Sequence, residues 1–170
     1  IMDYFSLFNL PPEFSLDKGE LAKRYKALQR QYHPDNFVNF PKEDRLKAVH
    51  QSSLINQAWK TLRHPLSRAA YLIDLQSENG VALASLVEES DFLIEQFCLR
   101  QELESLEKSL NPEKLSTFLR RVESRLEDGL DSIQKELNEK RWHEASVTLQ
   151  KMRFLEKLFL EADKLLDAEP

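Results

Sequence analysis

Glycine and cysteine are scarce in this chain of 170 residues, and no apolar run approaches the roughly 20 residues that cross a bilayer. The chain has only three glycines, which favours long helices because tight hairpin turns usually need glycine. The single cysteine, Cys98, has no partner for an internal disulfide, and no secretory signal pattern opens the sequence. We therefore expect an all-α protein of the reducing cytoplasm that is neither membrane-inserted nor exported.

Charged residues of both signs are plentiful, but they are unevenly divided. The formal net charge is -5, yet residues 1–75 hold 11 basic and 8 acidic residues, whereas residues 76–170 hold 13 and 21. The two halves are therefore expected to meet different partners. A small positive surplus without interleaved aromatics or a groove-reading motif argues against nucleic-acid binding, which needs many phosphate contacts.

The first third of the chain contains a helical pattern that stops at a proline. Four apolar residues recur at helical spacing: Leu21, Tyr25, Leu28 and Tyr32. Pro34 disfavours the α conformation for His33 and has no N–H to donate, so this helix is expected to end near Tyr32. A second helix is expected from about Pro41 to Leu62, antiparallel to the first because the connection is only about eight residues long. The two helices are expected to share a small core of Tyr25, Leu28, Ile55 and Trp59.

The opposite side of the first helix is basic. It carries Lys23, Lys26 and Arg30, with Arg24 at its edge. The ordinary interpretation of such a cluster is a solvated surface. This cluster, however, runs directly toward a loop that bears the imidazole of His33 and the carboxylate of Asp35. We therefore expect it to face an acidic protein partner.

The tripeptide His33-Pro34-Asp35 has an ordinary interpretation as an exposed histidine, a helix stop and a turn residue. An enzyme that uses His33 and Asp35 as an acid–base pair is disfavoured because no nucleophile or pocket-forming element accompanies them. One cysteine and four scattered histidines also lack the spacing of metal ligands. We expect no enzymatic activity, no cofactor and no metal site.

A short helix is expected from Leu66 to Leu75, and the strongest turn signal of the chain follows it, from Gln76 to Gly80. The expected division is an N-terminal domain of residues 1–75, a linker of residues 76–85 and a C-terminal domain of residues 86–170. Short breaks separate three further helices, which favours an antiparallel three-helix bundle. These helices are expected from Leu86 to Leu110, from Pro112 to Asn138 and from Arg141 to Asp167.

The helix expected from Leu86 to Leu110 has more apolar residues than one core stripe uses. The stripe consists of Phe92, Leu99, Leu103, Leu106 and Leu110. Leu93, Ile94 and Phe97 fall on the opposite side, and Phe154 lies off the core line of the last helix. Isolated surface hydrophobes are common, so burial against the N-terminal domain stays open, but four together favour a binding patch.

The residues around the tripeptide resemble a J-domain over about residues 3–65. Tyr25, Leu28 and Tyr32 precede it, and Ile55-Asn56-Gln57-Ala58-Trp59 and Leu62-Arg63-His64-Pro65 follow it. J-domains dock on DnaK-type chaperone ATPases. The resemblance implies that His33, Pro34 and Asp35 trigger ATP hydrolysis there, and that the ATPase also contacts Lys23, Arg24, Lys26 and Arg30. Asn36 departs from the lysine that family members commonly carry at this position.

Over nearly its full length the chain is similar to the HscB-type co-chaperones of iron–sulfur cluster biogenesis. The similarity rests on Met2-Asp3-Tyr4-Phe5, His64-Pro65-Leu66, Ala69-Ala70-Tyr71-Leu72 and Phe92-Leu93-Ile94-Glu95-Gln96. It implies a C-terminal bundle that binds the cluster scaffold protein and presents it to a dedicated DnaK-type ATPase. The implied scaffold contacts are Leu93, Ile94, Phe97, Phe154 and Gln101. Cys98, Gln101 and Ser105 stand where the family often has acidic residues.

The expected fold is therefore all-α, with a J-domain built on an antiparallel helical hairpin with short flanking helices, followed by a three-helix bundle in an L-shaped arrangement. The expected function is a cytoplasmic co-chaperone that stimulates a DnaK-type ATPase and delivers the scaffold protein, with no nucleic-acid or membrane partner. The alternative is a general J-domain co-chaperone that delivers unfolded client proteins, which would not need a selective apolar patch.

Overall fold

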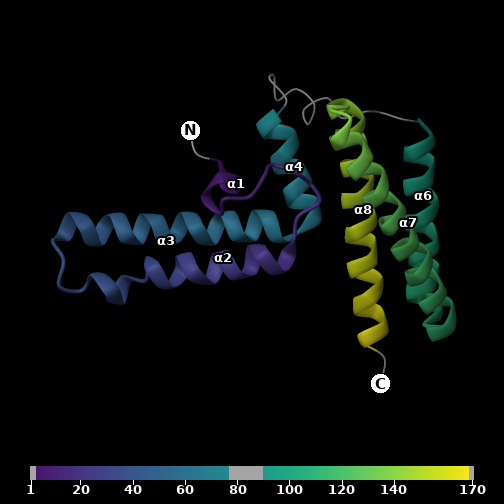
Figure 1. Cartoon of the computed structure of the whole chain (residues 1–170). Helices are drawn as coiled ribbons and strands as arrows, with labels where there is room; N and C mark the ends of the chain where they lie inside the picture. Colours follow the sequence, from purple (N-terminus) through teal and green to yellow (C-terminus); the bar gives the residue numbers. More distant parts are fainter. Residues whose placement is uncertain (1–2, 77–89, 169–170) are drawn as a thin grey trace. The chain divides into compact units, whose positions relative to one another are not determined.

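The computed structural model describes residues 3–76 and 90–168, and every regular element in these ranges is helical (Figure 1), which confirms the all-α prediction. The chain divides into two compact units, one up to Leu72 and the other from Ile73 onward. The predicted turn after Gln76, the linker and the first residues of the next helix lie outside the described residues. The elements are α1 (Tyr4–Leu7), α2 (Lys18–Gln31), η1 (Pro34–Phe37), α3 (Lys42–Arg63), α4 (Pro65–Gln76), α6 (Ser90–Ser109), α7 (Pro112–Asn138) and α8 (Trp142–Asp167).

The N-terminal unit is built on the antiparallel hairpin of α2 and α3 (Figure 1). Asp17 caps α2, because its carboxylate accepts the Glu20 N–H at 3.0 Å. Tyr25 of α2 stacks on Trp59 of α3 with ring centroids 4.5 Å apart. The fully buried side chains include Phe5, Phe8, Leu21, Ile55 and Leu62, and burying each of them stabilises the fold by about 1.5–3 kcal/mol.

The short α1 and the first part of α4 complete this unit. The ring of Tyr4 stacks on that of Tyr71 at 4.6 Å, and the Tyr4 N–H donates to the Tyr71 hydroxyl at 2.9 Å. Arg68 is buried; its guanidinium donates to the Leu62 carbonyl at 2.8 Å and lies 5.0 Å from the Phe14 ring. Burial lowers the pKa of Arg68. The start of α4 is therefore fixed to the hairpin by specific polar and aromatic contacts.

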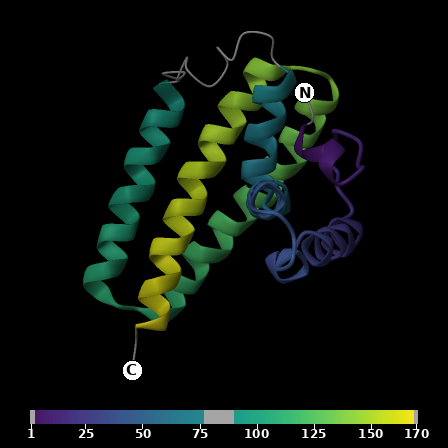
Figure 2. The same ribbon diagram turned by 90° about the vertical axis from the view of Figure 1, so that its left-hand side faces the viewer.

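In the C-terminal unit, α6, α7 and α8 lie side by side in both ribbon views (Figure 2). Asn111 caps α7 by accepting the N–H groups of Glu113 and Lys114 at 3.1 and 3.2 Å. α8 packs on both α7 and α6, so apolar residues from all three helices meet in one core. The buried members of this core are Leu103, Leu106, Leu115, Phe118, Leu119, Val122, Leu155, Leu158 and Ala162.

α7 and α8 approach closely at Gly129. A Cβ atom at this position would lie 2.8 Å from the Met152 Cγ, so a larger residue requires Met152 to move. Glycine inside a helix costs about 1 kcal/mol relative to alanine. The close approach of the two helices therefore accounts for a residue that helix propensity disfavours.

One predicted core residue is on the surface. Leu110 was expected in the core stripe of the helix from Leu86, but it is 56% exposed. α6 ends at Ser109, and Leu110 takes a left-handed conformation with φ of 48° while its N–H donates to the Leu106 carbonyl at 3.0 Å. The left-handed residue ends the helix and redirects the chain, so the last position of the stripe leaves the core.

Candidate functional site

The tripeptide forms a compact turn rather than an open loop. His33 caps the 3-10 helix η1, because its Nδ1 accepts the Asp35 N–H at 3.1 Å. The Asn36 N–H donates to the His33 carbonyl at 3.0 Å, and the Asn36 side chain donates to the Arg30 carbonyl at 2.6 Å. These bonds tie the turn to the end of α2. Asn36, which departs from the common lysine, thus has a structural role that its type alone did not indicate.

The same contacts determine what His33 presents to a partner. Its Nδ1 accepts a backbone N–H, so the hydrogen of the neutral imidazole lies on Nε2. The Asp35 Oδ2 is 3.6 Å from the same Nδ1, which has no hydrogen to donate in that state. The two side chains are 53% and 87% exposed, so they offer polar groups to another surface rather than an enclosed acid–base pair.

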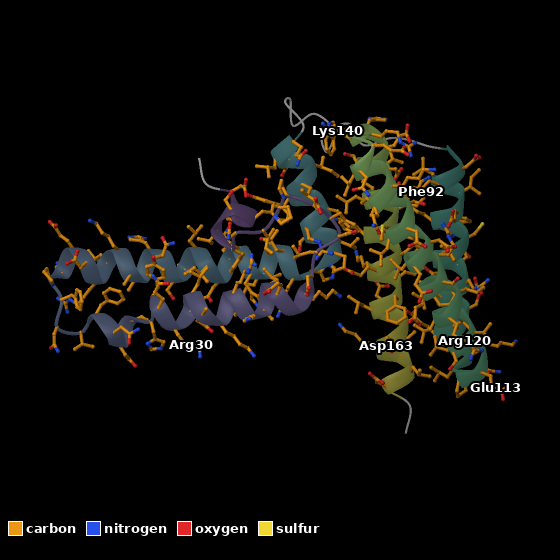
Figure 3. The ribbon with its side chains drawn as sticks, in the orientation of Figure 1. Arg30, Phe92, Glu113, Arg120, Lys140 and Asp163 are labelled. Carbon is orange, nitrogen blue, oxygen red and sulfur yellow. The ribbon has the colours of Figure 1, made fainter. Side chains whose placement is uncertain are left out.

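The structure separates the basic residues of α2 into two kinds. Lys23, Lys26 and Arg30 are exposed, and Arg30 lies on the side of α2 turned away from α3 (Figure 3). Arg24 is half-buried: its guanidinium donates to the carbonyls of Phe8 and Asn9 and lies 3.7 Å from the Glu20 carboxylate. Arg24 therefore holds the segment after α1, and its charge is partly used within the unit.

A second exposed surface lies on α6. Leu93, Ile94 and Phe97 are 52%, 63% and 65% exposed. Cys98 and Gln101 follow them and are exposed as well. We call Leu93, Ile94, Phe97, Cys98 and Gln101 the α6 strip. None of these side chains carries a charge, and Ser105, one turn beyond Gln101, extends the uncharged surface. The strip has the character of an apolar docking surface.

Phe154 is placed differently from the three exposed residues. It is half-buried against the core of the bundle, and its ring meets that of Phe92 edge to face with centroids 5.9 Å apart. The Arg100 guanidinium lies 5.6 Å from the same ring. α8 packs on two helices, so its buried face is wider than the single core line read from its periodicity. Phe154 therefore supports α6 from beneath.

Three ion pairs between helices were missed by sequence reasoning. Arg125 of α7 pairs with Glu95, Arg121 of α7 pairs with Glu102, and Arg100 of α6 pairs with Glu161 of α8. The hydrogen bond from Arg100 lowers the pKa of Glu161. The partners lie on different helices and 19 to 61 positions apart, so no local spacing rule connects them.

No group of three or more His, Cys, Asp or Glu side chains in residues 3–76 and 90–168 is arranged to hold a metal ion. Within the same ranges, no helix is both long enough and apolar enough to cross a membrane.

Two protein families match successive parts of the chain. Residues 3–71 match the DnaJ domain, and residues 88–163 match the HSCB C-terminal oligomerisation domain. An exposed His-Pro-Asp turn on a helical hairpin, followed by this bundle, defines the class of J-domain co-chaperones. Membership of this class implies a chaperone of the DnaK (Hsp70) type as partner.

Solved structures narrow the class to a family. Chaperone HscB from Vibrio cholerae is 38% identical, with 98% of each chain covered and a TM-score of 0.86. The human co-chaperone HscB is 28% identical over 95% of this chain and 81% of that chain, with a TM-score of 0.85. The Jac1 co-chaperone from Saccharomyces cerevisiae, at 18% identity over 96% of each chain and a TM-score of 0.75, shares the fold. The chain belongs to the HscB family of J-domain co-chaperones, which act in iron–sulfur cluster biogenesis.

Proposed function

We propose that this chain stimulates ATP hydrolysis by a DnaK-type chaperone dedicated to iron–sulfur biogenesis and delivers the cluster scaffold protein to it. One observation carries the proposal. The chain combines an exposed, hydrogen-bonded His33-Pro34-Asp35 turn with an exposed, uncharged apolar strip on a separate helix. The turn can present polar groups to the ATPase, and the strip can bind the scaffold protein. A location in a reducing cytoplasm is proposed with it, on the basis of the single Cys98 of the sequence.

Stimulation is allosteric in this proposal. The turn adds no group to the phosphate, but it favours hydrolysis if it binds the hydrolysis-competent state of the ATPase better than the other state. The bonds of Asn36 and His33 hold the turn in one conformation before docking, so little conformational entropy is lost on binding. Exposed Lys23, Lys26 and Arg30 attract an acidic surface and raise the association rate. Arg24 contributes less, because its guanidinium is bonded within the unit.

Delivery of the scaffold protein rests on the α6 strip, with Phe154 beneath it. Fully burying one large apolar side chain contributes about 1.5–3 kcal/mol. From full exposure, the four side chains Leu93, Ile94, Phe97 and Phe154 would together give a gross gain near 10 kcal/mol before association costs are subtracted. Leu93, Ile94 and Phe97 are 52%, 63% and 65% exposed, so the gain is about half of that. Phe154 is already half-buried, so its share is smaller. A micromolar complex corresponds to about -8 kcal/mol, so we expect transient binding, as suits a protein that hands its cargo onward.

The test is the steady-state ATPase rate of the DnaK-type chaperone, titrated with this chain in the presence and absence of the scaffold protein. His33→Gln is expected to remove stimulation while circular dichroism and melting temperature stay nearly unchanged. His50→Gln is the matched control, because His50 is also an exposed histidine of the hairpin. Full stimulation by His33→Gln contradicts the role of the turn.

The strip is tested by isothermal titration calorimetry with the scaffold protein. Leu93→Ala with Phe97→Ala is expected to abolish binding and the extra stimulation that the scaffold provides, while stimulation without scaffold remains. Leu160→Ala, which removes an exposed leucine of α8, is the control. Unchanged scaffold affinity in the double variant favours a general co-chaperone that delivers other clients.

A further inference from the structure

The half of α6 that carries the strip contributes no fully buried side chain, although Phe92 and Leu99 make partial contacts with the bundle. Among the α6 side chains from Asp91 to Ser109, Leu103 and Leu106 are buried, and both belong to the second half of the helix. From Asp91 to Glu102, each side chain is exposed or half-buried. Burial of apolar area, which holds α7 and α8 together, therefore fixes the strip-bearing half of α6 only weakly.

Two hollows lie along the seam between α6 and α7. The larger has a volume of about 640 Å³ and lies between Ser109 of α6 and Thr117 of α7, among other residues of the two helices. The smaller, of about 290 Å³, is lined by Leu99 of α6, Val122 of α7 and Leu155 of α8. Apolar side chains therefore leave parts of the seam unfilled, so polar contacts can cross it beside the apolar core.

Ion pairs cross the seam at these hollows. Arg121 lines both hollows and pairs with Glu102, whereas Arg125 lines the smaller one and pairs with Glu95. The two arginines are one helical turn apart on α7, so they form a single row facing α6. On the other side of α6, Arg100 pairs with Glu161 of α8 and lies over the Phe154 ring.

The α6 residues that contact α7 and α8 alternate along the helix with the residues of the strip. Glu95 lies between Ile94 and Phe97 in sequence, and Arg100 lies three residues after Phe97. Phe92 is also held from below, because its ring meets Phe154 edge to face and lies 5.7 Å from the Lys151 ammonium. The inward side of each turn is therefore held by a charged or aromatic contact, while the outward side presents the strip.

We propose that Arg125 with Glu95 and Arg100 with Glu161 are positioning pairs, which hold the first half of α6 so that the strip is presented to the scaffold protein as one surface. The inference rests on the proposed function of the strip. These residues act through α6, because the strip itself carries no charge. Loosening either pair lowers scaffold affinity without removing any side chain of the strip, because the bound orientation is then only partly populated.

The first measurement reports on α6 alone. Cys98 is the single cysteine of the chain and is exposed, so a nitroxide attached there reports the mobility of this helix by its electron paramagnetic resonance line shape. Arg125→Gln is expected to increase label mobility with little change in melting temperature. Arg120→Gln is the matched control, because Arg120 bonds Thr117 within its own helix (Figure 3).

The second measurement is scaffold affinity of the unlabelled protein by calorimetry. Arg125→Gln is expected to weaken binding by about 5- to 10-fold, and Arg120→Gln to leave it unchanged. The charge exchange of Glu95→Arg with Arg125→Glu is expected to restore both affinity and label immobility. A merely destabilised bundle would not recover in this way. Stimulation of the ATPase without scaffold stays at the wild-type level in all three variants.

The outcomes separate the two proposals. Wild-type mobility or wild-type affinity in Arg125→Gln overturns the positioning role, as does failure of the charge exchange to restore binding. Unchanged scaffold affinity in Leu93→Ala with Phe97→Ala overturns the proposed scaffold contact instead. The predicted loss of scaffold affinity in Arg125→Gln then no longer follows. The label at Cys98 shows in either case whether the ion pair orders the helix.

Discussion

The two candidate surfaces of this protein are maintained by contacts of different range. The His33-Pro34-Asp35 turn is held by hydrogen bonds among residues at most six positions apart, and Pro34 is the first residue of η1. The α6 strip is held by pairs such as Arg125 with Glu95 and Arg100 with Glu161, which join different helices. We therefore expect the turn to tolerate changes elsewhere in the chain and the strip to depend on the whole bundle.

The largest expected effect is on the bundle core. Phe118 is fully buried, so Phe118→Ala is expected to lower the free energy of unfolding of its unit by about 3–5 kcal/mol. Scaffold binding is expected to weaken with it, because the strip needs the assembled core. Urea unfolding followed by circular dichroism measures the change. Unchanged scaffold binding in a variant destabilised by about 3 kcal/mol or more would mean that the strip does not depend on the core.

The second largest effect is expected at Pro34, the proline of the turn. Pro34→Ala permits α2 to continue past Tyr32, which misplaces His33 and Asp35. We expect stimulation of the ATPase to fall at least about 10-fold, equivalent to about 1.4 kcal/mol, with a smaller change in stability. Pro41→Ala, at the start of α3, is the matched control. Wild-type stimulation by Pro34→Ala would show that the local turn geometry is dispensable.

A smaller effect is expected at the amide that ties the turn to α2. Asn36→Ala removes the hydrogen bond to the Arg30 carbonyl, a bond of the kind that contributes about 0.5–1.5 kcal/mol. Stimulation is expected to fall a few-fold because the turn must then be ordered on docking. ATPase titration measures the half-maximal concentration. Asn39→Ala, an exposed asparagine of the same connection, is expected to have no effect.

The stability of the bundle is expected to depend on pH through Glu136. Burial raises the pKa of the Glu136 carboxyl, although the Thr148 hydroxyl donates to it at 2.6 Å. The folded state therefore holds this proton more tightly than the unfolded state, so stability falls as pH rises from the ordinary glutamate value through the raised one. Glu136→Gln is expected to be more stable than wild type at neutral pH. In urea titrations the difference should shrink on acidification, and a growing difference would contradict the sign.

The smallest effect concerns the end of α7. Lys140 has a φ of 59°, a conformation that glycine adopts without strain. Lys140→Gly is expected to raise the free energy of unfolding by up to about 1 kcal/mol. Lys135→Gly, inside the same helix, is expected to lower it by a similar amount. Equal effects at the two positions in chemical unfolding would contradict this reading of the helix end.

Local features were readable from the sequence. Helical periodicity and the scarcity of glycine predicted an all-α chain, and α7 spans Pro112–Asn138 as predicted, between an asparagine cap and a left-handed residue. Pro34 predicted the end of α2 near Tyr32. The exposure of Leu93, Ile94 and Phe97 agrees with the predicted patch, because residues opposite a complete core stripe have nowhere to be buried on their own helix. These features depend on neighbours within a few positions.

What the sequence determined by itself is thus the long helices and the end of α2 before the His33-Pro34-Asp35 turn, since both follow from backbone geometry within one or two turns. Only the tertiary structure decided that Arg24 bonds the Phe8 carbonyl, that Leu110 leaves the core and that Phe154 packs beneath α6. It also brought Arg125 to Glu95. Such contacts join residues far apart in the chain, and their partners are determined by how the helices pack rather than by the periodicity of any one helix.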